Sequence, residues 1–383
     1  MTRTDATSRL ACLLLSQLIT SFGFFFTAEK PTYAQNFLFW DSNGNGHLTQ
    51  KDGSSNWNPI GKREWWNGAS NVNWDNASDS IAVFGNGNSG GIAGVITVTH
   101  EIQAQGIRFE TTSGSYTLQN TAGNSIILGD AGILASTSAT VHAQVTLAEG
   151  QSWEVANSER LVFGGTIIGS VPLEKSGEGC LVFTAASPAM SGTVTVSSGT
   201  LQVLNASGSA TGTGAVFVGN AATLEGTGSI AGPVQVNAGG SVAPGYSGSG
   251  NVGTLTFNGG LLLAGGASAH FQLGSVSSFD RLVINGALSL SSTTQLMVGV
   301  MDGFVPQLGQ SFDLLDWGTL NFSEDKLDTC LVLPNISAHH LAWDTSLFQE
   351  SGAISITTAA PEPGRTCLSL LGILCILNKR RWH

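Results

Sequence analysis

Hydrophobic and polar residues alternate along short runs of this chain, and small residues close each run. Residues 180–183, 193–196 and 200–204 show the pattern most clearly, with Gly, Ser or Pro between the runs. Alternation with a period of two is typical of a strand with one buried face, and the small residues favour turns. A strand of about five residues cannot bury its face alone, so these strands need neighbours stacked on them.

Similar runs recur through most of the chain. Before the central stretch they fall at 95–99, 106–109, 116–119, 125–128, 141–147, 153–155 and 160–163. After it they fall at 215–218, 234–236, 254–257, 261–263 and 270–273. From residue 280 the apolar residues are larger, and strands are expected near 295–300, 311–315, 330–333, 339–343 and 353–357. The pattern predicts an all-β chain.

The central stretch, residues 172–205, resembles a known repeat family. Its segment 173–179, followed by two Gly-Thr strands, looks like the autotransporter-associated β-strand repeat of bacterial surface proteins. That resemblance implies a right-handed parallel β-helix (a solenoid) that is exported and passenger-like. The likeness extends over residues 165–273 and is looser before them.

Composition agrees with an ordered β protein and narrows the classes of partner. Of 383 residues, 50 are Gly and 11% are charged, yet apolar residues recur at strand spacing, unlike in disordered chains. Between residues 35 and 360, acidic residues outnumber basic ones 23 to 8. A nucleic-acid partner is therefore not expected, because phosphate contacts need clustered Lys and Arg.

The N-terminus has the features of a secretory signal peptide over residues 1–34. Arg3 and Arg9 flank the start of an apolar centre at 10–26, and residues 32–34 place small side chains at the cleavage positions. A mature chain starting at Gln35 is expected. An uncleaved anchor is the alternative, because the apolar centre is long.

The C-terminus, residues 359–383, resembles the PEP-CTERM sorting tail. The order is Pro361, Glu362 and Pro363, an apolar run at 367–377, then Lys379, Arg380 and Arg381. The resemblance implies an exosortase-type sorting enzyme as partner, extracellular polysaccharide as a companion, and a Gram-negative-type bacterial host. The apolar run is short for a membrane span of about 20 residues, so transient inner-membrane association before processing is expected. An ordinary hydrophobic C-terminus is the alternative.

The segment 35–95 is rich in Trp and Asn and is predicted to form an N-terminal β cap. Five of the nine Trp lie here: Trp40, Trp57, Trp65, Trp66 and Trp74. A cap shields the exposed sheet edge at the end of a solenoid. The alternative is an aromatic platform for sugar rings. Solenoid repeats are then predicted over 96–279, and a C-terminal β cap over 280–358.

A calcium loop is a weaker candidate in the same segment. Asp41, Asn43, Asn45 and Asp52 fall at positions 1, 3, 5 and 12 of a calcium-binding spacing, with Gly46 at the turn. No helices flank the loop, and Gly/Asn turns are common in this chain. Calcium is therefore the one cofactor considered, and no catalytic metal is expected.

Apparent catalytic motifs in the sequence are better explained as turns. Ser89 lies in a Gly-x-Ser-x-Gly match that is followed by a strand, whereas a nucleophile elbow needs a helix there. The G-x-G-x-x-G matches at 85–90 and 248–253 open no βαβ unit. His339 and His340 are adjacent in an expected strand, so they would point to opposite faces.

Carboxylates and cysteines leave two questions open. Glu174, Glu178 and Glu225 are candidate acids for glycan cleavage, but Glu174 and Glu178 are placed in the turn of the repeat. Cys180 and Cys330 either form a disulfide or remain two unrelated thiols.

The preferred hypothesis is a non-enzymatic cell-surface or extracellular-matrix protein with a structural or adhesive role. The alternatives are a carbohydrate-binding module and a polysaccharide-cleaving enzyme.

Overall fold

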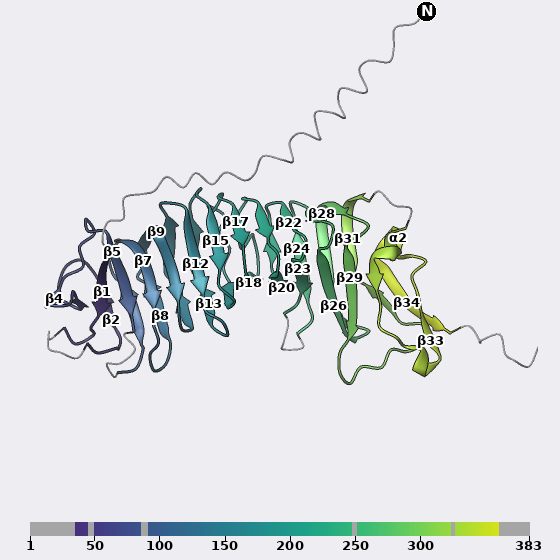
Figure 1. Ribbon diagram of the computed structural model, residues 1–383, viewed down its shortest axis with the longest axis horizontal. Helices are drawn as coiled ribbons and strands as arrows, with labels where there is room; N and C mark the ends of the chain where they lie inside the picture. The colour runs from purple at the N-terminus through teal and green to yellow at the C-terminus, as the bar shows by residue number, and fades with distance from the viewer. Residues whose placement is uncertain (1–34, 45–49, 86–90, 247–250, 323–325, 360–383) are drawn as a thin grey trace, which may run out of the picture. The chain divides into compact units, whose positions relative to one another are not determined.

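The computed structural model describes residues 35–44, 50–85, 91–246, 251–322 and 326–359. Over these residues the chain is almost entirely β structure and forms a parallel β-solenoid of about 9 turns, with very little helix (Figure 1). The predicted all-β solenoid class is thereby confirmed. The signal peptide predicted for 1–34 and residues 360–383 of the predicted tail lie outside the described residues.

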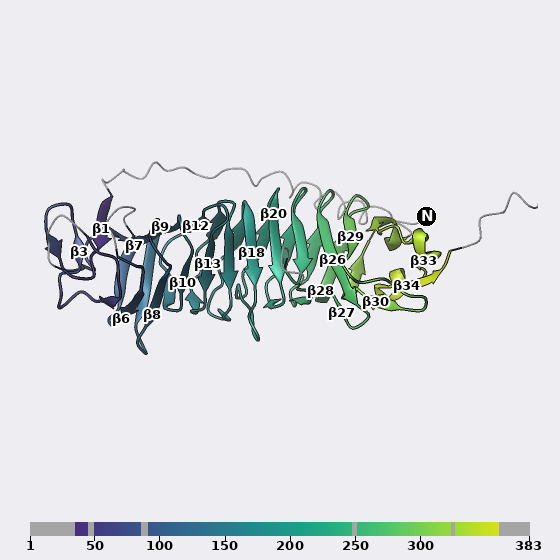
Figure 2. The same cartoon turned by 90° about the horizontal axis from the view of Figure 1, so that it is seen from below.

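One sheet, which we call sheet B, takes one strand from each coil (Figure 2). Its neighbouring strands are parallel; Arg160–Phe163, for example, pairs with Cys180–Phe183. In spatial order its strands are β2 (Ser55–Trp57), β6 (Val95–Val98), β8 (Tyr116–Asn120), β10 (Ala139–Val141), β13 (Arg160–Phe163), β16 (Cys180–Phe183), β18 (Gly199–Val203), β20 (Ala222–Gly226), β23 (Ser241–Pro244), β26 (Ser268–Ser275), β29 (Gln295–Val300) and β32 (Leu331–Val332). The short β27 (Ser278–Phe279) pairs with β26 in antiparallel fashion.

The other large sheet, sheet A, bends so that it covers the remaining sides of the coils. The long strand β9 pairs through its first residues with β11 and through its last residues with β12. Its strands are β1 (Asn36–Trp40), β3 (Trp65–Trp66), β4 (Asn71–Val72), β5 (Ser80–Phe84), β7 (Ile102–Phe109), β9 (Ser125–Ala135), β11 (Gln144–Leu147), β12 (Gln151–Val155), β14 (Ile167–Ile168), β15 (Leu173–Ser176), β17 (Val194–Val196), β19 (Val216–Val218), β21 (Ser229–Ile230), β22 (Val234–Val236), β24 (Thr254–Phe257), β25 (Leu261–Leu263), β28 (Arg281–Leu290) and β31 (Leu315–Asn321).

Side chains that stack in register from coil to coil fill the interior. In sheet B the buried column consists of Ala139, Leu161, Leu181, Leu201, Leu224, Val242, Ala269 and Leu296. Each of these alternates with an outward residue, which explains the period of two in the sequence. Burying one Leu or Val contributes roughly 1.5–3 kcal/mol, so the column holds neighbouring coils together.

Glycine allows the coils to approach closely at one turn. Gly192, Gly214 and Gly232 stack one coil apart at this turn. A Cβ atom on each would overlap the carbonyl oxygen of Val171, Gly192 and Gly214, respectively. A larger side chain would therefore push the backbones of neighbouring coils apart.

Four tryptophans fill the interior of the first coils. Trp40, Trp57, Trp65 and Trp74 are at most 1% exposed, and ring contacts within the group formed by these four and Phe84 have centroid distances of 4.8 to 5.7 Å. β1 runs antiparallel to β3 and so departs from the order of the coils. Parallel pairing begins at β2 and β5, within the segment expected to form the cap.

The C-terminal region ends in a small antiparallel sheet. It contains β30 (Ser311–Asp313), β34 (Ala353–Thr358) and β33 (Leu341–Asp344), and the helical turns nearby are η1 (Leu327–Cys330), η2 (Ser337–His339) and α2 (Phe348–Ser351). The strands expected near 295–300 and 353–357 are confirmed. The expected strand 311–315 is divided between β30 and the start of β31, and that at 330–333 is reduced to β32. The strand expected at 339–343 starts only at Leu341, because His340 has a left-handed backbone (φ 58°) after η2. His339 and His340 therefore do not share a strand.

Candidate functional site

A hydrogen-bonded row of polar side chains lies on the outer face of sheet B. Arg160 Nη2 donates to Gln202 Oε1 at 2.7 Å, and Gln202 Nε2 donates to Glu225 Oε1 at 2.8 Å. Gln202 and Glu225 are at most 4% exposed, although they alternate with the inward Leu201 and Leu224. The buried Gln202 and Glu225 are therefore hydrogen-bonded within the protein, whereas Arg160 at the end of the row is exposed.

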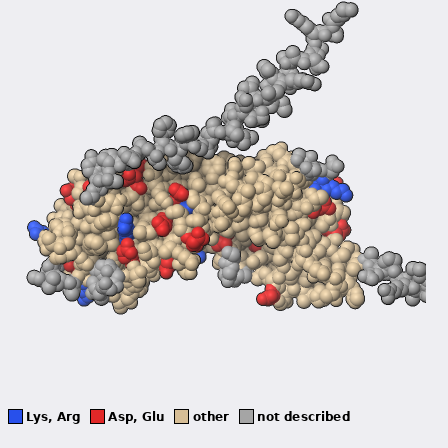
Figure 3. Space-filling view, in the orientation of Figure 1, with Lys and Arg blue, Asp and Glu red and all other residues tan. Residues whose placement is uncertain are grey.

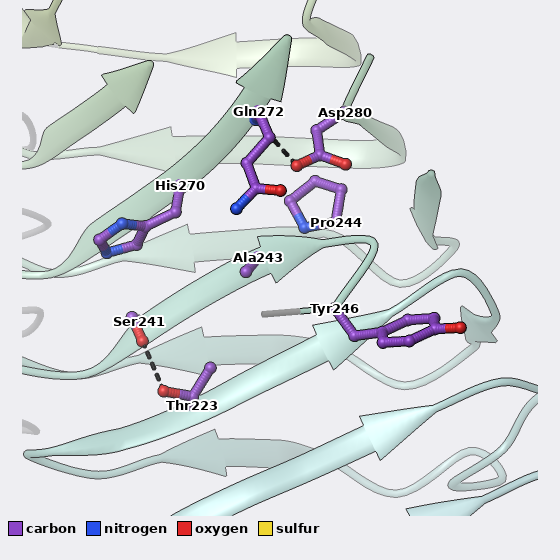
Figure 4. A pocket seen from close by; sticks show the side chains of 8 residues that line it. All are labelled: Thr223, Ser241, Ala243, Pro244, Tyr246, His270, Gln272 and Asp280. Carbon is purple, nitrogen blue, oxygen red and sulfur yellow. Dashed lines mark hydrogen bonds between the residues drawn. The ribbon is translucent and has the colours of Figure 1, made fainter. Parts of the chain in front are cut away.

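Next to this row, the outer face is hollowed over β20, β23 and β26. The hollow has a volume of about 220 Å³ and is lined by Thr223, Ser241, Ala243, Pro244, Tyr246, His270, Gln272 and Asp280. Figure 4 shows Ala243 between His270 and Gln272 on one side and Thr223 and Ser241 on the other. The space arises because an alanine takes an outward position between larger neighbours.

Most polar atoms around the hollow pair with near neighbours. The hydroxyls of Thr223 and Ser241 are 2.8 Å apart, and His270 Nε2 lies 3.0 Å from Ser268 Oγ. Burial lowers the pKa of His270, which favours the neutral imidazole. In contrast, the side-chain amide of Gln272 forms no hydrogen bond within the described residues, and Figure 4 shows it pointing into the hollow. This amide is available to a ligand.

Asp280 holds two strands in place at the edge of the hollow. Its Oδ1 accepts a hydrogen bond from the Gly253 N–H and its Oδ2 one from the Gln272 N–H, both at 2.8 Å. The residue is 2% exposed, and burial raises its pKa to about 7, against the opposing effect of the two backbone donors. Both carboxylate oxygens are thus engaged by the backbone.

Formal charge is sparse on the surface of the chain. On the face shown in Figure 3, residues that are neither acidic nor basic form most of the surface. The chain as a whole contains 26 Asp and Glu but only 15 Lys and Arg. A partner held by many ion pairs does not fit such a surface.

The residues of the predicted calcium loop have separate partners where they are described. Asp41 Oδ1 accepts a hydrogen bond from the Lys51 N–H, and its Oδ2 accepts one from Asn71 Nδ2, both at 3.1 Å. Asp52 accepts hydrogen bonds from the hydroxyls of Thr112 and Tyr116, while Asn45 lies outside the described residues.

These contacts give the two aspartates a structural role in joining the first coils. No group of three metal-ligating side chains occurs among the described residues, and calcium binding stays a prediction. Burial, followed by the hydrogen bond to Asp52, raises the pKa of Tyr116 far above its usual value, so its hydroxyl stays a donor.

The buried tryptophans do not provide a platform for sugars. The rings of Trp40, Trp57, Trp65 and Trp74 pack against one another and are almost completely shielded from solvent. Trp66 is half-buried. The structural interpretation of this Trp-rich segment therefore fits, and a stacking surface made of these four rings does not.

Lys175, which stands in the sequence between Glu174 and Glu178, lies inside the solenoid. It occupies an inward position of β15, is 0% exposed, and its Nζ donates to the carbonyl oxygens of Ser176, Gly177 and Ser198 at 2.7 to 3.0 Å. Burial lowers its pKa to about 8, although nearby negative groups oppose the shift. The alternation Leu173-x-Lys175 was the signal for this orientation.

The candidate catalytic groups are dispersed over different elements. Glu174 lies on β15 of sheet A, where it accepts a hydrogen bond from Ser197, whereas Glu225 lies on β20 of sheet B. Glu178 follows β15, as the turn prediction required, but Glu174 is in the strand itself. Ser89 and the residues of the predicted sorting signal, 361–363 and 379–381, lie outside the described residues.

The two cysteines of the solenoid body are not joined by a disulfide. Cys180 is half-buried on β16 and Cys330 is buried at the end of η1. The open alternative of a disulfide between them is therefore wrong. In the part of the chain that is described, no helix has the length and apolarity needed to cross a bilayer.

Comparison with known proteins gives one partial likeness to an adhesin. No family model matches the chain. The "Adhesin BmaC autotransporter" of Brucella suis biovar 1 (strain 1330) is 29% identical over 177 residues, which is 45% of this chain and 4% of that protein. The chain thus spans a small fraction of this relative's length. Its similarity to part of an autotransporter adhesin agrees with the β-solenoid described above.

Proposed function

We propose that this chain is a non-enzymatic, exported protein of the bacterial cell surface or extracellular matrix, with a structural or adhesive role. The observation that carries the proposal is the parallel solenoid with a continuous packed interior, in a chain similar to part of an autotransporter adhesin. Stacked coils with interior side chains in register give a stiff scaffold. A surface with few charged residues fits a scaffold better than it fits an enzyme that binds ions.

We further propose that residues 359–383 direct sorting by an exosortase-type enzyme, with transient inner-membrane association. The proposal rests on the order of Pro361–Pro363, an apolar run and Lys379–Arg381 in the sequence. An apolar run followed by basic residues retains a chain in the membrane with the basic end on the cytoplasmic side. Processing would then release the solenoid to the surface.

The intact mass of the protein in the membrane, surface and medium fractions of its own host tests both the proposed export and the proposed sorting. A form that starts near Gln35 and ends near Pro361, found in the surface or medium fraction, is the expected result. A form that keeps Arg381 and occurs only in membranes would overturn the surface proposal. A matched host strain whose chain stops at residue 358 controls for the tail, because it should lose the retained precursor.

The adhesive role is tested by attachment of the host. A strain without this chain is expected to attach less to the matrix of its own biofilm, and the wild-type chain should restore attachment. Unchanged attachment in both strains would contradict an adhesive role. The release of reducing ends from matrix polysaccharide should be equal with and without the chain, because the proposal assigns no glycan cleavage.

A further inference from the structure

We propose that the hollow on the outer face of sheet B binds a unit of a neutral, hydroxyl-rich glycan. The inference rests on the proposed adhesive role and names the class of ligand for it. It starts from a hollow of about 220 Å³ on an otherwise regular sheet, with an unpaired amide pointing into it (Figure 4). Pockets that combine apolar walls with a few convergent polar groups are typical of small-molecule sites.

The polar groups of the hollow match a sugar better than an ion. The Gln272 amide offers two donors and one acceptor, and the hydroxyls of Thr223 and Ser241 both donate and accept. His270 adds a largely neutral ring whose Nε2 lies near Ser268 Oγ. Sugar hydroxyls likewise both donate and accept, so they can pair with each of these groups.

The hollow also has an apolar part. Ala243 and Pro244 line it together with Tyr246, whose ring is turned away from Ala243 in Figure 4. A pyranose ring presents C–H groups on its faces, and aromatic and proline rings pack well against such surfaces. The combination of the apolar Ala243 and Pro244 with uncharged hydrogen-bonding groups fits one sugar unit.

The charged groups near the hollow are already engaged. Both carboxylate oxygens of Asp280 accept backbone hydrogen bonds, and Glu225 accepts one from Gln202. The Arg160 guanidinium donates to the same Gln202. A cationic ligand therefore lacks a free carboxylate here, and an acidic glycan meets no lysine or arginine among the residues that line the hollow.

A peptide is less suitable than a glycan at this place. β20, β23 and β26 each pair with a strand on both sides, so none of them offers an edge for an added strand. Strand addition needs such an edge, because the affinity comes from main-chain hydrogen bonds. The hollow therefore offers no unpaired strand edge to a peptide.

Outward polar side chains in matching positions of neighbouring strands continue the proposed site along sheet B. Thr200, Thr223, Ser241, Ser268 and Gln295 occupy matching outward positions in successive coils. Strands of a sheet lie about 4.8 Å apart, so a glycan chain running across the coils meets a hydroxyl or an amide at each step. The ligand class is therefore a linear neutral polysaccharide, held most closely at the hollow.

A glycan array followed by calorimetry tests the site. The full chain, purified from its host, is applied to printed gluco-, manno-, galacto- and xylo-configured neutral hexasaccharides and to hexauronates. Binding is expected to neutral members alone. Gln272→Ala should weaken the best of them about tenfold, the size expected for losing one or two hydrogen bonds, and Ala243→Phe should abolish binding by filling the hollow.

Gln119→Ala is the matched control, because Gln119 is exposed on β8 of the same sheet and away from the hollow. It should bind like the wild type, and all variants should unfold thermally at similar temperatures. Binding to hexauronates only, to nothing, or equally by Gln272→Ala and wild type would overturn the inference. Surface location without glycan binding would overturn this inference alone, whereas glycan binding by a chain confined to membranes would overturn the proposed surface function and leave the site intact.

Discussion

Individual buried residues show how the solenoid tolerates charge. Lys175 lies between Trp153 and Val196 in the interior because alternation along β15 turns it inward. Its three hydrogen bonds to carbonyl oxygens satisfy the ammonium donors. Removal from water still disfavours the charge, and for this reason its pKa falls to about 8.

We expect Lys175→Met to change how stability depends on alkaline pH. Burial penalises the charged lysine in the folded chain, so the penalty is complete below pH 8 and declines as the pH rises from about 8 to 10.5. The free energy of unfolding of the wild type should therefore rise relative to the variant in this window, by at most about 1.4 kcal/mol per pH unit. Urea unfolding at several pH values measures it, and parallel pH curves would contradict the assignment.

Asp280→Asn should show the opposite dependence at acidic pH. The pKa of Asp280 is raised from 3.8 to about 7, so its contribution to stability is greatest below pH 3.8 and is lost as the pH rises through 7. Over that window the wild type should lose up to about 1.4 kcal/mol per pH unit relative to the variant. Thermal unfolding across pH 4 to 7.5 tests this, with Asp302→Asn as an exposed control; equal slopes for all three chains would argue against it.

At the level of elements, alternation located strands well where both inward positions are hydrophobic. The strands expected at 160–163, 180–183, 234–236, 254–257 and 261–263 match β13, β16, β22, β24 and β25. Two strands that were not predicted, β15 and β23, place Lys175 and Pro244 at buried positions, where a hydrophobic pattern is interrupted. Pairing with neighbouring coils stabilises these strands, and one sequence does not display that pairing.

The hollow was not predictable for a related reason. Thr223, Ala243 and His270 are far apart in the sequence, and only the register of β20, β23 and β26 brings their coils together. The lengths of the turns between strands set that register. Alternation alone tells which residues point outward, but not which outward residues are neighbours.

Gly214→Ala tests the close approach of the coils. The added Cβ would overlap the carbonyl oxygen of Gly192, so the variant should lose about 1–3 kcal/mol of stability through overpacking. Gly299→Ala is the control, because its Cβ would meet only the Phe271 carbonyl oxygen at 3.9 Å. Denaturant unfolding compares the two, and equal midpoints would show that the glycine turn is not needed for stacking.

At the level of the whole solenoid, stability depends on contacts between neighbouring coils. Strands pair mainly with the coils before and after them, as in other repeat proteins, so each end relies on shielding of its last coil. The tryptophan cluster fills the first coils, and the antiparallel pair β1 and β3 lies beside it. Loss of this packing should therefore loosen the N-terminal coils before those farther along the chain.

Trp57→Ala is the test of this graded stability. Trp57 is 0% exposed and contacts Trp65, Trp74 and Phe84, so truncation should cost about 3–5 kcal/mol locally. Hydrogen exchange is expected to speed up first in β2, β5 and β6, while β23 to β28 remain protected. Trp66→Ala, at a half-buried ring, should leave exchange close to that of the wild type. Uniform loss of protection along the chain would instead mean that the coils unfold as one cooperative unit.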